Sequence, residues 1–217
     1  MYLTRMEIDT RRRNTMKALV SPNLIHGAIE AAFPGERTRK LWRIDQLGKH
    51  CYVLLLSDKE PNLQNAAEQF GVLDADKKWE TKDYNKLLER IKNNTVWHFR
   101  LTANPTKCCK NENGGRGIVR AHITPFHQEK WLQERSEKNG FSLKADDFFV
   151  VESKWQRFYK GAERKKPVTL LAVTYEGVLT VTNAEKFCET LVNGIGRGKA
   201  FGMGMLTVVK AGDIRNE

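Results

Sequence analysis

Three parts of the sequence carry side chains suited to chemistry on a phosphate group. One is His26, which lies in a segment with the pattern of an amphipathic helix. Another is a basic segment with interleaved aromatic residues, 155–166. The third, 194–205, alternates glycines with two cations and with apolar residues. A proton acceptor or donor, cations and backbone N–H donors are the groups that phosphoryl transfer requires.

The glycine-rich stretch predicts a loop that binds phosphate. Glycine accepts positive φ angles, and N–H groups in such a loop converge on anions. The expected RNA-binding residues of this stretch are Gly194, Gly196, Arg197, Gly198, Lys199, Gly202 and Gly204. The alternative is a glycine that only ends a helix at Gly194, which would leave the four later glycines unexplained.

The common nucleotide-binding loops do not fit this stretch. A P-loop needs Ser or Thr after its lysine, but Ala200 follows Lys199, and Asn193 stands where the first glycine belongs. A dinucleotide fingerprint needs a strand before the glycines and a helix after them. Here a helical pattern, 183–192, precedes them and a strand pattern, 205–209, follows.

His26 is the candidate catalytic residue. We expect it in the second turn of a helix over 23–33, beside the apolar stripe. A nearby helix N-terminus disfavours imidazolium, so a neutral histidine that accepts a proton is expected, with Glu30 one turn on to orient it. The alternative is a partly buried packing histidine. Four histidines have weaker contexts, namely His50, His98, His122 and His127.

The basic segment 155–166 predicts contact with nucleic acid. Its candidate RNA-binding cations are Arg157, Lys160, Arg164, Lys165 and Lys166. Such cations fix register on phosphates, and in an A-form stem they read bases best near a helix end or a loop. The alternative is a solvated hairpin tip.

The overall charge supports a polyanionic partner. The chain has 217 residues with 37 Lys and Arg against 26 Asp and Glu, a net charge of +11. A chain this basic is expected to meet nucleic acid first and an anionic membrane second. It lacks an apolar run of about 18 residues and a signal-peptide core, so we expect a cytoplasmic protein.

The cysteine and histidine spacing argues against a metal site. None of the four cysteines forms a C-x-x-C pair, and His122 and His127 are five residues apart. We therefore expect reduced thiols, no metal and no cofactor. Paired carboxylates with metal-site spacing are also missing, which favours metal-free chemistry.

The elements that must position these residues follow the same order twice. The first half predicts strand 2–8, a basic loop 11–17, helix 23–33, strands 41–47 and 51–56, helix 63–70 and a weak strand within 79–90. The second half predicts strand 96–102, a mobile basic loop 104–124, helix 125–138, strands 148–151 and 170–175, helix 183–192 and strand 205–209. Two βαββαβ runs predict an α+β fold of two tandem ferredoxin-like (RRM-like) domains, 1–92 with His26 and 95–217 with the basic hairpin and the glycines.

Several motifs together carry a family resemblance. They are the start Met-Tyr-Leu-Thr-Arg-Met, the helix Pro22-x-x-x-His26, Phe99-Arg-Leu-Thr-Ala-Asn-Pro105, Tyr175-Glu-Gly-Val-Leu179 and the glycine-rich ending. Over nearly its whole length the chain resembles the CasE family, the CRISPR repeat-RNA endoribonucleases of type I-E systems.

The resemblance implies an activity. Members bind the stem-loop of the repeat transcript and cut at the 3′ base of the stem without metal. They then retain the crRNA as a subunit of the Cascade complex. The family's catalytic histidine matches His26, and a tyrosine found three residues earlier in some relatives is Asn23 here. The alternative is a non-catalytic RNA-binding scaffold subunit, which would not need His26.

Overall fold

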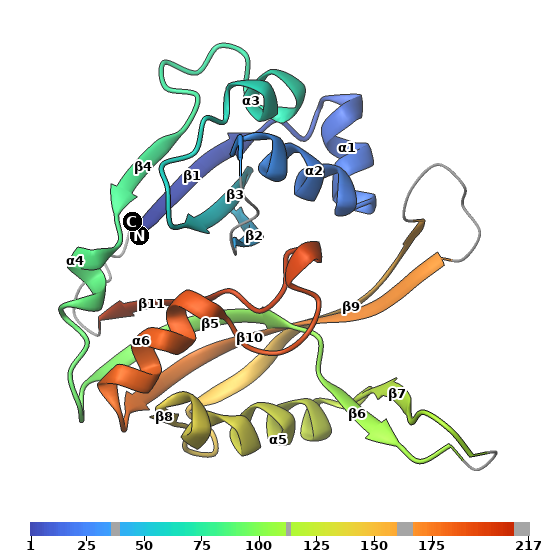
Figure 1. Ribbon diagram of the computed structural model, residues 1–217, viewed down its shortest axis with the longest axis vertical. Coiled ribbons are helices and arrows are strands. Elements are labelled where there is room, and N and C mark those ends of the chain that lie inside the picture. The colour runs from blue at the N-terminus through green and yellow to red at the C-terminus, as the bar shows by residue number, and fades with distance from the viewer. Residues whose placement is uncertain (36–39, 112–113, 160–166, 211–217) are drawn as a thin grey trace. The chain divides into compact units, whose positions relative to one another are not determined.

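Two antiparallel sheets organise the chain in the computed structural model (Figure 1). The structure describes residues 1–35, 40–111, 114–159 and 167–210. The described residues fall into two compact units. The first unit takes its residues from Met1–Arg90, Gln156–Thr169 and Lys199–Met203, and the second from Ile91–Trp155, Leu170–Gly198 and Gly204–Glu217.

The first unit contains a four-stranded sheet in the order β2-β3-β1-β4. Its strands are β1 Tyr2–Ile8, β2 Leu41–Leu47, β3 His50–Ser57 and β4 Glu80–Asp83. Its helices are α1 Arg13–Val20, α2 Asn23–Ala31, α3 Gln64–Phe70 and α4 Asn85–Leu88. This strand order and the βαββαβ connectivity define the ferredoxin-like arrangement, with two helices, α1 and α2, in its first crossover.

Alternating burial along the strands explains which face of this sheet the helices cover. Met6 and Ile8 of β1 point to the same face and are both 2% exposed. They share a core with Ile25 and Ile29 of α2 and with Phe70 of α3. The apolar side chains that recur every second residue in the strand and about every 3.6 residues in the helix therefore pack together in one layer.

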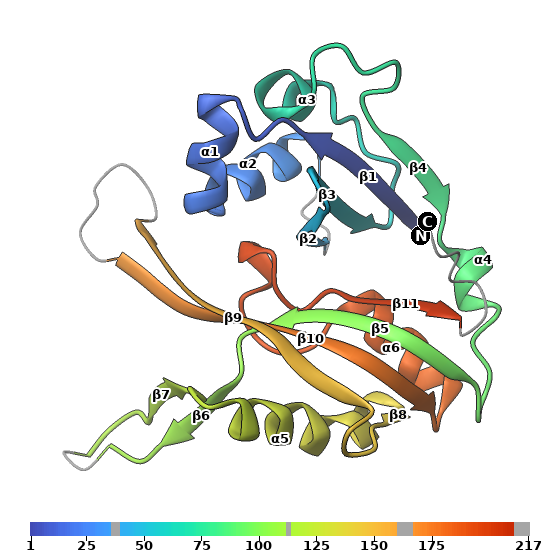
Figure 2. The same ribbon diagram turned by 180° about the vertical axis from the view of Figure 1, so that it is seen from behind.

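The second unit contains a five-stranded sheet in the order β11-β5-β10-β8, with β9 also pairing with β10. Its strands are β5 Val96–Ala103, β8 Phe141–Ser142, β9 Phe148–Tyr159, β10 Pro167–Val181 and β11 Leu206–Lys210, of which β9 and β10 extend into the first unit. Its helices are α5 Pro125–Ser136, the 3₁₀ turn η1 Glu137–Asn139 and α6 Ala184–Asn193. Figures 1 and 2 show α5 and α6 on the same side of this sheet, as in a second ferredoxin-like arrangement.

A separate two-stranded sheet projects from the second unit. It pairs β6 Thr106–Cys109 with β7 Ile118–Ala121 in antiparallel register. In both ribbon views it extends beyond the start of α5. The expectation of a mobile loop over 104–124 is therefore wrong for these strands. Each has only four residues, too few for a clear period-two pattern.

The start of the chain departs from the sequence-based expectation in one further place. Residues 13–17, expected in a basic loop, belong to α1. This helix ends at Ser21, whose N–H donates to the carbonyl of Lys17. Most other expected helices and strands are present with ends shifted by no more than two residues, and β4 is the weak strand expected within 79–90. The exceptions are the strands expected over 148–151 and 170–175, which are much longer, as β9 Phe148–Tyr159 and β10 Pro167–Val181.

None of the helices in the described ranges is long and apolar enough to cross a membrane.

Candidate nucleic-acid interface

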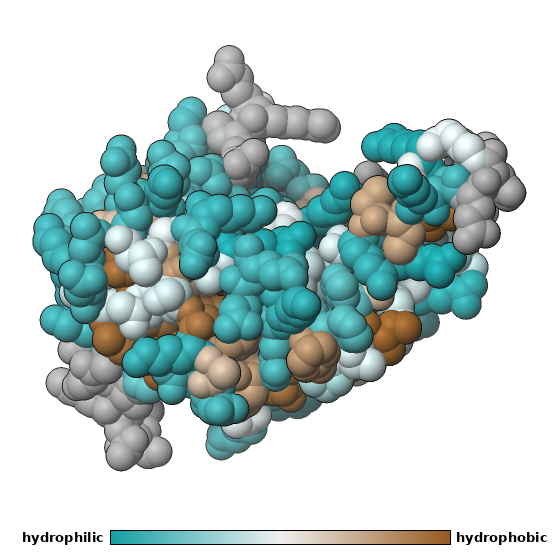
Figure 3. All heavy atoms as spheres, turned by 90° about the horizontal axis from the view of Figure 1, so that it is seen from below, coloured by the Kyte–Doolittle hydropathy of each residue, from teal (hydrophilic) through white to brown (hydrophobic). Residues whose placement is uncertain are grey.

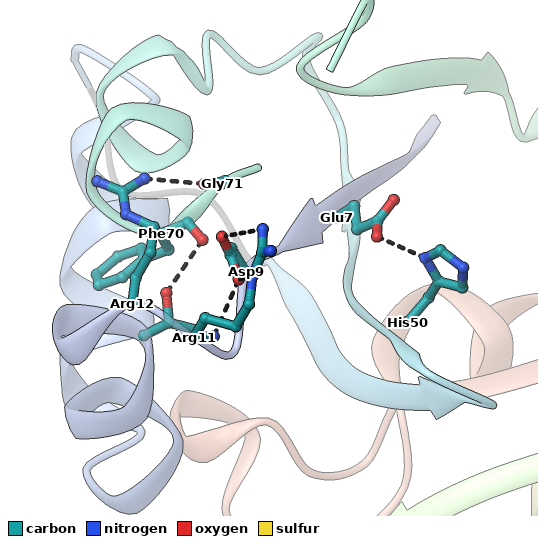
Figure 4. Close-up of polar contacts among 8 residues, drawn as sticks. Glu7, Asp9, Arg11, Arg12, His50, Phe70 and Gly71 are labelled. Atoms are coloured by element: carbon teal, nitrogen blue, oxygen red, sulfur yellow. Dashed lines mark hydrogen bonds and ion pairs between the residues drawn. The ribbon is translucent and has the colours of Figure 1, made fainter. Parts of the chain in front are cut away.

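Helix α1 is fixed by side chains that reach the C-terminal end of α3 (Figure 4). The Arg12 guanidinium donates to the carbonyl of Gly71 at 2.8 Å and to that of Glu68 at 2.6 Å. The Thr15 hydroxyl, fully buried, donates to the carbonyl of Phe70 at 3.1 Å. The last carbonyls of a helix have no partner within the helix, so these contacts satisfy them while they anchor α1.

Once anchored, α1 forms one wall of a basic groove in the first unit. The groove has a volume of about 790 Å³ and is lined by Arg13, Met16, Lys17, Val20, Ser21, Asn23, Leu24, Arg157, Phe158 and Tyr159. Arg13 and Lys17 are four residues apart and therefore lie on one face of α1. With Arg157 they supply three cations among the described lining residues, which include no carboxylate. The groove is suited to a phosphate backbone.

Asn23 contributes a buried acceptor to this groove. It begins α2, and its Oδ1 is buried with no hydrogen-bond partner among the described residues. Leaving such an oxygen unpaired costs about 1–3 kcal/mol. A ligand hydroxyl or amino group that donates to Oδ1 would recover that cost, so Asn23 is suited to a hydrogen-bond contact with a ligand in the groove.

His26 lies one turn further along the same helix. Its side chain is half-buried, and its backbone N–H donates to the carbonyl of Pro22 at 3.0 Å. Within the described part of the chain its imidazole has neither a hydrogen bond nor an ion pair, and it is not among the residues that line the groove. The expectation that Glu30 orients it is not met. Glu30 instead accepts from Lys40 Nζ at 3.3 Å.

The structure brings part of the basic segment to this groove. Arg157 and Tyr159 are exposed on β9 and line the groove, while Phe158 is buried between them. The other four candidate cations of the segment, Lys160, Arg164, Lys165 and Lys166, lie outside the described residues. The Phe158 ring packs on Phe201 at 5.0 Å between centroids. Phe201 belongs to the 3₁₀ turn η2 Lys199–Phe201, which contacts α2 and β2, so Lys199 stands on an element next to the helix of His26.

The glycines of the C-terminal stretch have several roles. Gly202 is buried at φ +77°, and a Cβ there would lie 2.9 Å from Cζ3 of Trp42. Gly204 is buried too, and its N–H donates to the carbonyl of Thr102. The N–H groups of Gly194 and Gly202 also donate within the chain, to Thr190 and Lys199. These three N–H groups are occupied by the fold.

The exposed part of the stretch lies in the second unit. Gly196 and Arg197 are exposed and Gly198 is half-buried. Gly196 has φ +80°, and a Cβ there would lie 3.1 Å from the Trp131 ring. Arg197 forms an isolated β-bridge with Asn104 of the Ala-Asn-Pro motif. The Oδ1 of Asn104 is buried and has no hydrogen-bond partner in the part of the chain that the structure describes. This is the portion of the stretch that is accessible to a ligand.

The remaining histidines and the cysteines belong to other surroundings. His50 pairs with Glu7 at 2.7 Å (Figure 4). His122 stacks on His127. The pKa of His122 is lowered mainly by burial and secondly by the positive charge of Lys107. The four cysteines are free thiols. In the described ranges no group of three or more His, Cys, Asp or Glu side chains is placed to hold a metal ion.

Two functional candidates were not identified from the sequence. Arg13 and Lys17 were expected in a loop, but their spacing of four was the available signal for a common helical face.

Figure 3 shows that hydrophilic residues cover most of one face of the molecule, with hydrophobic patches between them. Two ferredoxin-like sheets, a groove with three cations and a nearby histidine define a nucleic-acid-binding class of protein.

The comparisons with known proteins give the family. A family model described as "CRISPR associated protein" matches residues 1–210, and the chain belongs to this family. The CRISPR-associated endoribonuclease Cse3 of Thermus thermophilus is 29% identical over 96% of this chain and 99% of its own length. Subunit CasE of the Escherichia coli CRISPR system Cascade is 29% identical over 51% of this chain and 56% of its own length.

The fold agrees with that assignment. The solved structure of Thermus thermophilus Cse3 bound to an RNA representing a pre-cleavage complex matches with a TM-score of 0.75 and 25% identity. The match covers 96% of this chain and 98% of that one. The tandem ferredoxin-like fold expected from the sequence is thereby confirmed.

Proposed function

We propose that this protein is a metal-independent endoribonuclease that binds the stem-loop of CRISPR repeat RNA and cuts at the 3′ base of the stem. It then retains the crRNA as a subunit of the Cascade complex, in the cytoplasm. The basic groove beside the helix of His26 carries the proposal. The likeness to Cse3, an endoribonuclease with RNA-bound structures, supports it over nearly the whole chain.

The proposed reaction is attack by the 2′-OH next to the scissile phosphate. The 2′ oxygen bonds to phosphorus, and the bond from phosphorus to the 5′ oxygen breaks. The products are a 2′,3′-cyclic phosphate and a 5′-OH. The 2′-OH must lose a proton and the leaving oxygen must gain one, and His26 performs one of these transfers. Cations beside the phosphate stabilise the charge that develops on its oxygens.

In this proposal, the two expected domains supply different catalytic and RNA-binding residues. The expected domain 1–92 supplies His26, and Arg13, Lys17 and Asn23 hold the RNA backbone in the groove. The expected domain 95–217 supplies the basic hairpin and the glycine-rich stretch. Within that stretch Gly196, Arg197 and Gly198 contact RNA and Lys199 contributes charge, whereas Gly194, Gly202 and Gly204 give the backbone its shape.

The first experiment is cleavage of labelled repeat RNA by the purified protein in EDTA, beside His26→Ala. His50→Ala is the matched control, because His50 is an exposed histidine of the same unit that pairs with Glu7. We expect the parent and the control to cleave at the stem base and His26→Ala to bind without cleaving. Binding without cleavage by all three would favour a scaffold, and cleavage by His26→Ala would show that another group is catalytic.

The substrate itself tests the chemistry. An RNA with one deoxynucleotide directly upstream of the scissile phosphate lacks the attacking hydroxyl. It is expected to bind with nearly the parent affinity and to remain intact. Normal cleavage of this RNA, or a strict requirement for Mg²⁺ with the unmodified RNA, would contradict the proposed mechanism.

A further inference from the structure

The β6–β7 hairpin carries a cluster of cations that the proposed cleavage site does not use. The cations are Lys107, Lys110, Arg116 and Arg120, and all four are exposed. Among the described residues, none of their side chains has an ion pair or a hydrogen bond. The hairpin sequence 106–121 contains one carboxylate, Glu112, which lies outside the described residues. The element therefore has a strong positive charge.

The strand register places two of these cations directly against each other. Lys107 is paired with Arg120, and the next pair on the same face is Cys109 with Ile118. Like charges directly opposite in an antiparallel pair destabilise the sheet. A two-stranded sheet alone is also marginally stable in water. The arrangement is thus unfavourable for the free hairpin and favours an anionic partner.

The same face also offers apolar surface. Ile118 is 44% exposed and lies between the cations and the turn. Val119, on the opposite face, is 46% exposed. The turn beyond them contains Gly114 and Gly115 at φ +77° and +89°. The cationic face therefore combines two positive charges with an exposed aliphatic side chain.

This combination fits single-stranded RNA better than a duplex stem. A stem presents phosphates on its outside and keeps its bases stacked inside. An unpaired strand presents phosphates together with exposed base faces, and proteins bind it with cations that follow the backbone and with side chains, most often aromatic, that contact the base faces. In this hairpin the exposed side chain of Ile118 supplies the apolar contact. We propose that the β6–β7 hairpin binds a single-stranded flank of the repeat RNA, outside the stem-loop. This inference rests on the proposed function and adds a second RNA contact to it.

The test compares two non-cleavable RNAs that carry a deoxynucleotide before the scissile phosphate. One is the repeat with both single-stranded flanks, and the other is the stem-loop without flanks. The variant Lys107→Gln/Arg120→Gln removes two charges. The control variant Lys138→Gln/Lys186→Gln also removes two exposed charges from the same unit, one on η1 (Lys138) and one on α6 (Lys186). Affinity is measured at several salt concentrations.

We expect the hairpin variant to bind the flanked RNA about tenfold more weakly and the trimmed stem-loop as the parent does. Two lost phosphate contacts to a single strand should reduce the slope of log affinity against log salt by about 1.4. The control variant should change both the affinity for the flanked RNA and the salt slope by much less. An unchanged affinity for the flanked RNA, or an equal loss on both RNAs, would overturn the inference.

A second pair of variants separates the two faces. Ile118→Thr should weaken binding of the flanked RNA without changing the salt slope, because no charge is removed. Val119→Thr, equally exposed on the other face, should leave binding unchanged. Equal effects of the two substitutions would contradict the assignment of the face. If the parent chain binds neither RNA, the proposed function itself fails, and that outcome is distinct from a failure of the hairpin alone.

Discussion

At the scale of single residues, Asn23 links stability to function. Its Oδ1 is buried, has no hydrogen-bond partner within the described ranges and belongs to a residue that lines the groove. A buried unsatisfied acceptor persists in a fold at a cost, so a ligand that donates to it explains its presence. In the proposed complex, a hydrogen bond from the RNA to this oxygen would recover the free energy that the unpaired acceptor costs the free protein.

The first prediction concerns this residue. Asn23→Ala should slow single-turnover cleavage about fivefold to tenfold, the effect of one hydrogen bond of ~1 kcal/mol. The melting temperature should stay the same or rise, because an unpaired buried oxygen is removed. Leu24→Ala is the control, since Leu24 lines the same groove without a polar group. A fall in melting temperature with no change in rate would show that Asn23 is structural.

A second residue prediction concerns Gly202. Its φ of +77° strains any other residue, and a Cβ would clash with the buried Trp42 ring. Gly202→Ala should therefore lower the free energy of unfolding by about 2–5 kcal/mol. Gly114 has the same φ, but a Cβ added there would have no neighbouring atom of the described residues within 4 Å. Gly114→Ala should therefore cost only the backbone strain. Equal losses for the two variants would rule out the clash as the cause.

At the scale of elements, the position of α1 determines the groove. Local patterns do not encode that position, because the hydrogen bonds from Arg12 and Thr15 to the end of α3 join residues 55–59 positions apart. Strand β5 is the opposite case. Its alternation of buried and half-buried residues follows the alternation of apolar and polar residues in the sequence, and Trp97 and Leu101 lie in the core.

The element prediction compares two neighbouring arginines. Arg12→Ala should lower the free energy of unfolding by about 1–2 kcal/mol, since the carbonyls of Glu68 and Gly71 lose a charged donor. Arg11→Ala should change stability little, because Arg11 is exposed and pairs locally with Asp9. Chemical denaturation measures both. A loss from Arg11→Ala as large as that from Arg12→Ala would contradict the anchoring role.

The pH dependence of the Arg11 effect provides a further check. Hydrogen bonds from Arg11 lower the pKa of Asp9 below the usual range of an aspartate. A group with a lowered pKa in the folded state contributes stability above its unfolded pKa and loses that contribution as the pH falls through the folded pKa. Any difference between the parent and Arg11→Ala should therefore be present at neutral pH and vanish in acid, while the Arg12→Ala difference remains.

At the scale of the whole molecule, the sequence predicted the fold class and the kind of partner but only part of the site. The periodicity of apolar residues predicted both βαββαβ runs, and the net positive charge indicated a polyanionic partner. The groove could not be predicted because Arg157 meets Arg13 and Lys17 only after folding. The glycines were read as one phosphate loop, yet packing against Trp42 explains Gly202. Local rules cannot separate a glycine required by tertiary packing from one required by a ligand.

The net charge of +11 leads to the last prediction, which concerns salt. Each phosphate contact releases counterions from RNA, so log affinity should fall linearly as log salt rises. With about six contacts the slope should be roughly −4 to −5. The single-turnover cleavage rate at saturating protein should change little, because the bound RNA already occupies the groove. Cleavage of labelled repeat RNA and filter binding between about 50 and 200 mM salt measure both quantities. A salt-independent affinity would contradict an electrostatic interface. A saturated rate that falls as steeply as the affinity would show that salt still screens the cations beside the reacting phosphate after the RNA is bound.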